Sequence, residues 1–75
     1  MGITLTQLKT GQAGRVLDLA QHGDIRRRLF DLGMIPGTMV ERVFGSPIGD
    51  PACYRVRGAL IALRASDAEQ VRVDV

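Results

Sequence analysis

Short runs of alternating apolar and polar residues predict a mostly β fold. The clearest run is VRVDV at 71–75, in which every second residue is valine. A period of two is typical of a strand with one face in the core and the other in water. Five such strands are too few for two separate sheets, so we expect one small, curled barrel. The predicted strands are residues 14–19, 39–44, 53–57, 60–64 and 71–75.

One segment has the period of an α-helix instead. Ile25, Leu29 and Leu32 are spaced i, i+4 and i+7. This spacing predicts an amphipathic helix over residues 24–32, with these three side chains facing the core. Asp24 is placed to cap the N-terminus of this helix with its carboxylate. The barrel is therefore expected to carry one inserted α-helix.

Glycine, proline and capping residues predict where the elements end. Gly33 is placed to end the helix in the left-handed conformation, and Pro36-Gly37 follows as a turn pair. Two capping boxes, TLTQ at 4–7 and SDAE at 66–69, each predict one short helical turn. Gly58 is expected to turn the chain tightly between the third and fourth predicted strands.

Length and composition favour one binding domain, residues 1–75, over an enzyme. A domain of this size buries only about 60% of the surface that its unfolded chain exposes, so its core is thin. The one cysteine, Cys53, and the one histidine, His22, have no third group to orient them as a nucleophile and base. No phosphate-binding glycine motif occurs either. We therefore predict no catalytic residues.

A metal site is the second kind of chemistry that the residues allow. His22 precedes the predicted helix, where it could join Asp18 or Cys53 in holding a transition metal. One histidine and one cysteine complete a tetrahedral site only if two carboxylates converge on them, and neither spacing is diagnostic. We expect no cofactor and no resident metal, with His22 exposed and Cys53 half buried in a strand. Transition-metal binding by these residues stays open as the alternative.

The predicted helix carries charges that oppose its dipole. Arginines occupy positions 26–28 near the positive N-terminus, and Asp31 lies near the negative C-terminus. Each such placement costs about 0.3–1 kcal/mol at low salt, which indicates a role for these charges beyond helix stability. Phe30 falls between the arginines, away from the apolar stripe, and an aromatic flanked by arginines resembles an interface anchor. The predicted partner-binding residues are Arg26, Arg27, Phe30 and Asp31.

The alternative for this helix is a solvated face of arginines. In that case Phe30 would pack beneath the long loop at 45–51, which is rich in glycine and proline. The sequence leaves both interpretations open.

The segment IRRRLFDLGMIPG at 25–37 closely resembles the hallmark of the bacterial ferrous iron transport protein A family, FeoA. GDP at 49–51, YRVRG at 54–58 and IALR at 61–64 follow in the order and spacing of that family's central hairpin. The resemblance covers essentially the whole chain. It implies an SH3-like barrel and a cytoplasmic accessory of ferrous iron uptake. Such a protein would dock on a membrane iron permease that carries a cytosolic G-protein domain.

A second resemblance concerns regulators. The same module resembles the C-terminal domain of metal-responsive repressors related to the diphtheria toxin repressor, but no helix-turn-helix segment precedes it here, which favours the transport accessory.

Three further expectations concern partners. Small basic barrels bind RNA. Three aromatic residues, and eight acids against ten basic residues, weigh against nucleic acid as a partner. No signal peptide or apolar span occurs, so membrane insertion is not expected. Barrel edges can pair with one another, so the sequence leaves a homo-oligomer open as a further partner.

Overall fold

The sheet of this protein runs through nearly the whole chain. The computed structural model describes residues 2–19, 23–45 and 48–75. Across them, six antiparallel strands form one sheet in the order β1-β6-β2-β3-β4-β5, which confirms the mostly-β prediction. The strands are β1 (Gly2–Thr4), β2 (Ala13–Leu19), β3 (Met39–Gly45), β4 (Ala52–Val56), β5 (Ala59–Leu63) and β6 (Val71–Asp74). The helical elements are the 3₁₀ turn η1 (Leu5–Gln7), α1 (Asp24–Asp31) and α2 (Ala65–Ala68).

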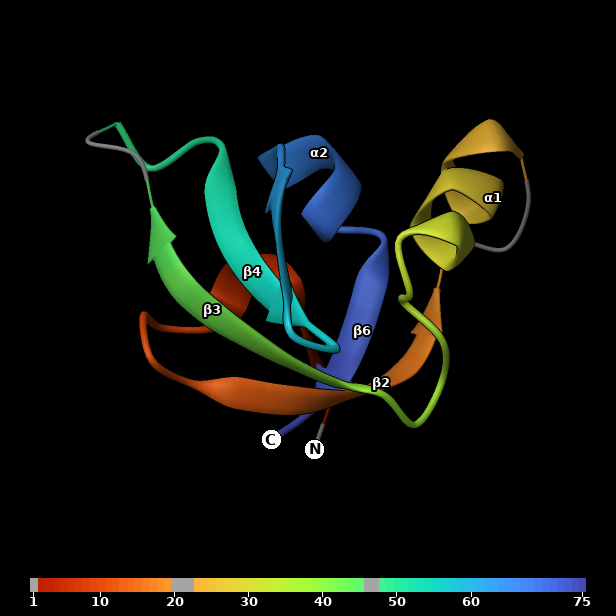
Figure 1. Cartoon of the computed structure of the whole chain (residues 1–75), viewed down its shortest axis with the longest axis horizontal. Coiled ribbons are helices and arrows are strands. Elements are labelled where there is room, and N and C mark those ends of the chain that lie inside the picture. Colours follow the sequence, from red (N-terminus) through yellow and green to blue (C-terminus); the bar gives the residue numbers. More distant parts are fainter. Residues whose placement is uncertain (1, 20–22, 46–47) are drawn as a thin grey trace.

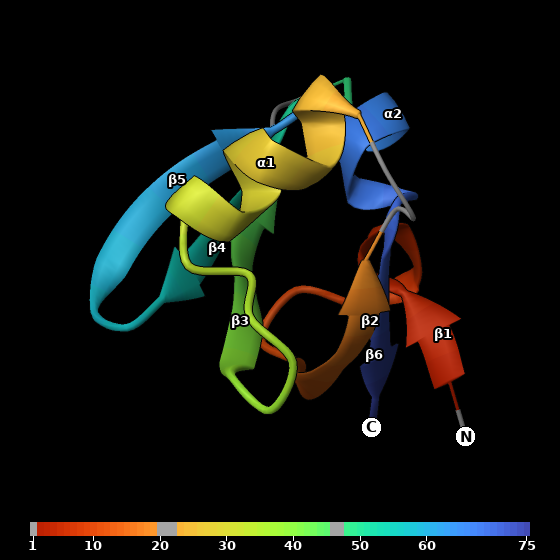
Figure 2. The ribbon, with the colours of Figure 1, turned by 90° about the vertical axis from the view of Figure 1, so that its right-hand side faces the viewer.

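The sheet curls around one core (Figure 1). Strands β2 and β3 cross the base and left of that view, while α2 and α1 lie along the top. Both termini lie together at the bottom, where β1 pairs with β6. The view turned by 90° shows α1 crossing above the strands on the side between β5 and β2 (Figure 2). The helix therefore covers a side of the barrel that no strand occupies in that view.

The five predicted strands correspond to β2–β6, with every end within one residue of the prediction. The sixth strand, β1, was not predicted, because three residues are too few to show an alternation. It forms by pairing with β6, where Ile3 lies opposite Val73. The existence of β1 therefore depends on a partner at the other end of the chain.

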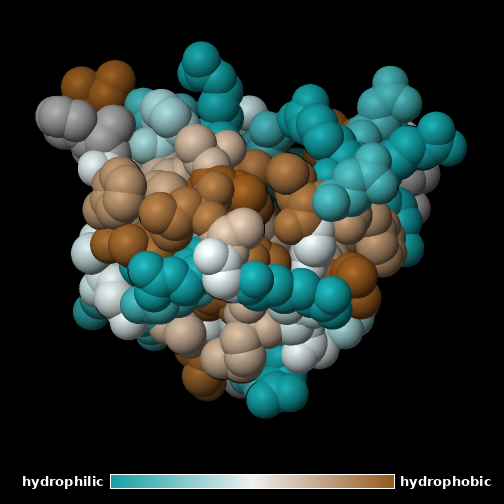
Figure 3. Space-filling view, in the orientation of Figure 1, coloured by the Kyte–Doolittle hydropathy of each residue, from teal (hydrophilic) through white to brown (hydrophobic). Residues whose placement is uncertain are grey.

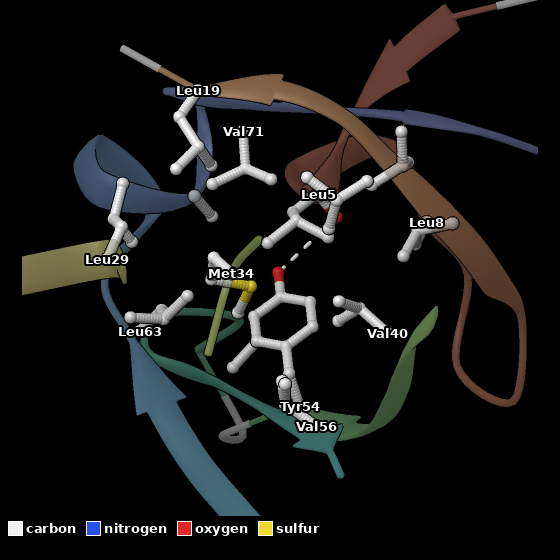
Figure 4. Packing of buried hydrophobic residues seen from close by; sticks show 14 residues of the cluster. Leu5, Leu8, Leu19, Leu29, Met34, Val40, Tyr54, Val56, Leu63 and Val71 are labelled. Carbon is white, nitrogen blue, oxygen red and sulfur yellow. Dashed lines mark hydrogen bonds between the residues drawn. The ribbon is translucent and has the colours of Figure 1, made fainter. Parts of the chain in front are cut away.

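Tyr54 occupies the centre of the core (Figure 4). Its ring lies among Leu5, Leu8, Met34 and Val40, and its hydroxyl donates a hydrogen bond of 3.3 Å to the carbonyl oxygen of Leu5. Burial raises the pKa of this phenol above its usual value of 10.0. Among the described residues, the core has 14 buried hydrophobic side chains: Leu5, Leu8, Val16, Leu19, Leu29, Met34, Val40, Ala52, Tyr54, Val56, Leu63, Ala68, Val71 and Val73.

The two short helical turns form where they were predicted, but only the first is capped as expected. The Thr4 N–H donates to Gln7 Oε1 at 2.9 Å, as a capping box requires. The second prediction was wrong in detail. Ser66 lies inside α2 and does not cap it, since the helix begins at Ala65. The Ala65 N–H instead donates to Asp50 Oδ1 at 2.8 Å, so the acceptor comes from a distant loop.

Helix α1 ends as predicted but differs at its start and in its burial. Gly33 has a φ of +96° and ends the helix in the left-handed region. The N-cap is Gly23, with no side-chain hydrogen bond, so the capping role predicted for Asp24 was wrong. Of the three stripe residues only Leu29 is buried, whereas Ile25 and Leu32 are 38% and 36% exposed. A helix of two turns at the margin of a thin core brings one side chain fully inside.

A two-residue turn joins β4 to β5. Arg57 and Gly58 have φ values of +52° and +83°, between Val56 and Ala59, which are paired. Positive φ at both central residues is the type I′ geometry that suits the twist of a hairpin, and it favours Asn-Gly. The tight turn predicted at Gly58 is confirmed. The arginine at the first position is strained, because its Cβ disfavours positive φ.

A bulge in β2 turns Asp18 toward Arg72 of β6. The register between β2 and β6 shifts between Val16 and Asp18. The Asp18 carboxylate then accepts hydrogen bonds from Arg72 Nε at 3.0 Å to Oδ1 and from Arg72 Nη2 at 2.9 Å to Oδ2. These hydrogen bonds hold the pKa of Asp18 below its usual value of 3.8, against the opposing effect of desolvation. Both side chains are 55% exposed, so water and salt screen the pair.

We expect Arg57→Asn to stabilise the fold by about 0.5–1 kcal/mol, because Asn adopts positive φ with little strain. For a domain of this length, that gain corresponds to a rise in Tm of about 2–8 °C in a thermal melt. Arg57→Ala is the matched control: it removes the same charge, but alanine lacks the side-chain amide through which Asn tolerates positive φ. An equal rise for the alanine variant would assign the effect to the lost side chain and contradict the strain.

The pair between Asp18 and Arg72 predicts a pH dependence. Because the pKa of Asp18 is depressed in the folded state, its stabilisation is complete above the usual value of 3.8 and is lost as the pH falls through the lowered value. An NMR titration of the Asp18 carboxyl should show this depressed pKa. Arg72→Gln should return it toward 3.8. Arg55→Gln, which breaks the separate pair with Glu41, should leave it unchanged.

Candidate partner-binding surface

Two of the four predicted partner-binding residues lie against each other on α1. The guanidinium carbon of Arg26 stands 4.7 Å from the centre of the Phe30 ring, which is a cation–π contact. Phe30 is partly buried and packs on the core cluster, so it is neither a free aromatic nor a wholly internal one. The guanidinium lies over the face of the ring. Both side chains therefore lie at one flank of the helix.

The other two predicted residues form the outer crest of α1. Arg27 and Asp31 are exposed and sit one turn apart, on the side of the helix away from the buried Leu29. Within the described residues, neither makes a hydrogen bond or an ion pair with a side chain. The crest thus presents one positive and one negative charge to solvent.

Ile25 and Leu32 lie on the second flank. A helical periodicity of 3.6 places both on the side opposite Phe30. Each residue has more than a third of its surface exposed, although the spacing of the two predicts that they face the core. We call the set Ile25, Arg26, Arg27, Phe30, Asp31 and Leu32 the α1 surface. It combines two partly apolar flanks with a charged crest.

Arg28, which belongs to the same basic run, has a structural role. Its Nη2 donates to Asp67 Oδ2 of α2 at 2.8 Å and thereby links the two helices. Asp67 is 39 positions away in sequence, so no local pattern indicated this pair. Of the three arginines, Arg28 therefore positions α1, and the α1 surface contains Arg26 and Arg27.

The residues considered for a metal site do not form one within the described part of the chain. His22 lies outside the described residues. Asp18 is engaged by Arg72, and Cys53 is half buried in β4, as expected for a strand residue. Among the residues described, no group of three or more His, Cys, Asp or Glu side chains lies close enough to hold a metal ion.

A polar cavity of about 270 Å³ opens at the end of the barrel near η1, and sequence analysis did not single out its residues. Arg42 and Asp50 line it from different segments, together with Tyr54 and Thr6. Arg42 Nη1 donates to the carbonyl oxygen of Leu8 at 3.0 Å, and the Asp50 carboxylate accepts from Ala65. The two charges of this cavity thus hold η1 and α2 in place. The visible signal was GDP at 49–51, which we assigned only to the hairpin motif.

Solved structures share both fold and sequence with this chain. A FeoA-like protein from Clostridium acetobutylicum matches with a TM-score of 0.92 and 31% identity, over 99% of this chain and 86% of that protein. FeoA from Stenotrophomonas maltophilia, solved in complex with zinc, matches with a TM-score of 0.84 and 34% identity, over 96% of this chain and 89% of that protein. The second is described as a prokaryotic SH3 domain protein, which confirms the expected SH3-like class.

A manganese-dependent transcriptional repressor has the same fold. Its TM-score is 0.86 over 97% of this chain, but the identity is 14% and the match covers 41% of the repressor. At that identity the likeness shows the fold alone, and nothing in it favours a regulatory or nucleic-acid-binding role for this chain.

One curated relative links the domain to transport. The Fe(2+) transport protein A/Fe(2+) transporter FeoB fusion protein of Porphyromonas gingivalis is 28% identical over 71 residues, which are 95% of this chain. The chain spans only 8% of the length of that relative. None of the helices described is long and apolar enough to cross a membrane. The FeoA domain model matches residues 3–75, nearly the full sequence, and the chain therefore belongs to the FeoA domain family.

Proposed function

We propose that this chain is an accessory protein of ferrous iron uptake that docks through the α1 surface on the cytosolic part of a ferrous iron permease. It would work in the cytoplasm by binding and without catalysing a reaction. The observation that carries the proposal is α1 itself, which leaves two core-type side chains, Ile25 and Leu32, partly exposed on a helix that also presents the exposed Arg27. Arginine is enriched among the residues that dominate interface energies, and apolar side chains beside it add surface that a partner can bury.

The fusion relative supports the choice of partner. In that protein a transport protein A segment and the transporter FeoB are named as one polypeptide. A covalent link holds two modules at an effective concentration of about millimolar. The partly exposed apolar flanks of α1 offer an interface for such an association, since burying apolar surface stabilises a complex by about 25 cal/mol per Å² removed from water.

The charges of α1 indicate what the opposite surface looks like. The exposed Arg27 favours an acidic partner, whereas Arg28 is already engaged by Asp67. Guanidinium groups bind carboxylates in a planar, bidentate geometry with two parallel hydrogen bonds. We infer that the permease presents carboxylates around an apolar patch. The attraction should then weaken as salt is added.

Docking affects transport only if the two conformations of the partner bind differently. A ligand with equal affinity for both states shifts no equilibrium, however tightly it binds. The FeoA of Stenotrophomonas maltophilia is itself described as a candidate activating factor for ferrous iron transport. We propose the same class of role here, with α1 favouring one state of the permease. Zinc was present in that FeoA, but we assign no metal to the docking step.

The test is a binding titration of the labelled chain against purified ferrous iron permease in detergent. Arg27→Glu reverses an exposed charge on the crest, and Leu32→Gln removes an exposed apolar flank. Each should raise Kd about tenfold or more, the loss expected of a contributing interface residue. Arg15→Glu is the matched control, because Arg15 is an exposed arginine of β2, outside the α1 surface. It should bind like the wild type.

Phe30→Ala needs a separate measurement. Since Phe30 packs on the core, its truncation should lower Tm as well as affinity, so it is interpreted only beside a thermal melt. Wild-type affinity for Arg27→Glu and Leu32→Gln would remove the α1 surface from the proposal. Failure of the wild-type chain to bind the permease at all would overturn the proposed function.

A further inference from the structure

Strand β5 is an edge strand without the features that usually protect an edge. It is the last strand in the sheet order, and its sequence, ALIAL at 59–63, has no charge and no proline. Native edge strands are normally blunted by lysine, proline, bulges or covering loops, because their free backbone groups pair with other chains. Leu60 is 53% exposed, and Ala59 and Ala62 are exposed as well. An apolar edge of this kind is unusual for a surface that stays in water.

The register with β4 shows which backbone groups are free. The two-residue turn makes Val56 and Ala59 a hydrogen-bonded pair, so Ala59, Ile61 and Leu63 direct their N–H and C=O groups toward β4. Leu60 and Ala62 direct theirs outward. Within the described residues these outward groups have no backbone partner. Figure 2 shows β5 at the margin of the molecule.

An apolar groove adjoins this edge. Cross-strand pairing places Phe44, Cys53 and Ala62 in one row on the outer face of β3, β4 and β5. With Pro51 they line a groove of about 320 Å³, and Phe44 is 54% exposed. Figure 3 shows an apolar area over β4 and β5, bordered by hydrophilic residues. Edge and groove share Ala62, so a strand added to β5 can place a side chain at the groove.

We propose that β5 is the pairing surface of a homodimer, in which β5 of a second copy adds antiparallel to β5 of the first. The two-fold axis passes between the two Ile61 residues. This register sets Leu60 opposite the partner's Ala62 and Ala62 opposite the partner's Leu60. Both outward-facing residues of each strand then form hydrogen-bonded pairs, and the large side chain of one strand fills the space beside the small one of the other.

The argument for a second copy, rather than another extended segment, is the self-complementarity of β5. Registers centred on Leu60 or Ala62 leave one outward-facing residue of each β5 with no β5 residue opposite it on the partner strand. No charge on β5 repels an identical strand, and each copy carries a formal net charge of only +2. The partner's Leu60 would lie next to Ala62 at the rim of the groove. This site is separate from the α1 surface and does not rest on the proposed function.

The association should be weak. A five-residue strand pair buries less than the roughly 1,200 Å² of a stable complex, so the dimer should form only at high protein concentration. Sedimentation velocity of the full chain in reducing buffer, from about 10 μM to 1 mM, should show the weight-average mass rising toward that of a dimer. A mass that stays monomeric across this range would overturn the proposal.

Two variants test the edge itself. Leu60→Lys adds the charge that edges normally carry, and Ala62→Pro removes an N–H that points away from β4. Each should raise the dimer dissociation constant at least tenfold while a thermal melt still shows a folded chain. Met39→Lys, at an exposed residue of β3, is the matched control and should leave the dimer unchanged. Dimers that survive both edge variants would contradict pairing through β5.

Cross-linking tests the register, and it stays informative if the edge variants do not fold. In a Cys53→Ser background, Ile61→Cys places the two thiols across the axis in a non-hydrogen-bonded pair, with Cα atoms about 4.5 Å apart. That separation is within disulfide range, so oxidation should yield a covalent dimer. Leu60→Cys is the control, because the two residues 60 are offset along the strands beyond that range. Equal cross-linking of both, or of neither, would overturn the proposed register.

Discussion

The hydrogen bond from the Tyr54 hydroxyl to the carbonyl oxygen of Leu5 joins residues 49 positions apart and closes the barrel around its centre. Tyr54 comes from β4, whereas Leu5 begins η1, which follows the edge strand β1. A buried phenol needs such an acceptor, since an unpaired hydroxyl there would cost about 1–3 kcal/mol. The ring that carries it fills the space between the two sides of the sheet. The other elements pack around this contact.

Helix α1 packs at the margin of this core. Its buried contribution is essentially Leu29, supplemented by Phe30 at one flank, and the pair between Arg28 and Asp67 ties it to α2. That attachment leaves most of the helix perimeter in water. A larger domain would have covered Ile25 and Leu32, but a barrel of 75 residues has too little core to do so. The exposed apolar flanks thus follow from the size of the domain as much as from any partner.

The strands could be predicted from sequence because alternation and turn glycines are local properties. Alternation places Val71 and Val73 on one face of a strand, and Gly33 and Gly58 end their elements because their backbone adopts positive φ. Contacts between distant segments could not be predicted in that way. The cap that Asp50 provides for α2 is one of them, and no capping rule for neighbouring residues indicates it. The local pattern at Ser66 was therefore misleading.

The candidate site shows the same division. Spacing on α1 predicted which side chains share a face, but it could not predict how much of that face the core would cover, since this depends on the whole barrel. The position of α1 is also tied to the β4–β5 hairpin. A Cβ at Gly33 would lie 3.3 Å from Val56 Cγ1 and 4.0 Å from Arg57 Cδ, so the end of the helix rests against the start of the turn. The same hairpin carries β5. The α1 surface and the β5 edge share no residue, but both adjoin this hairpin.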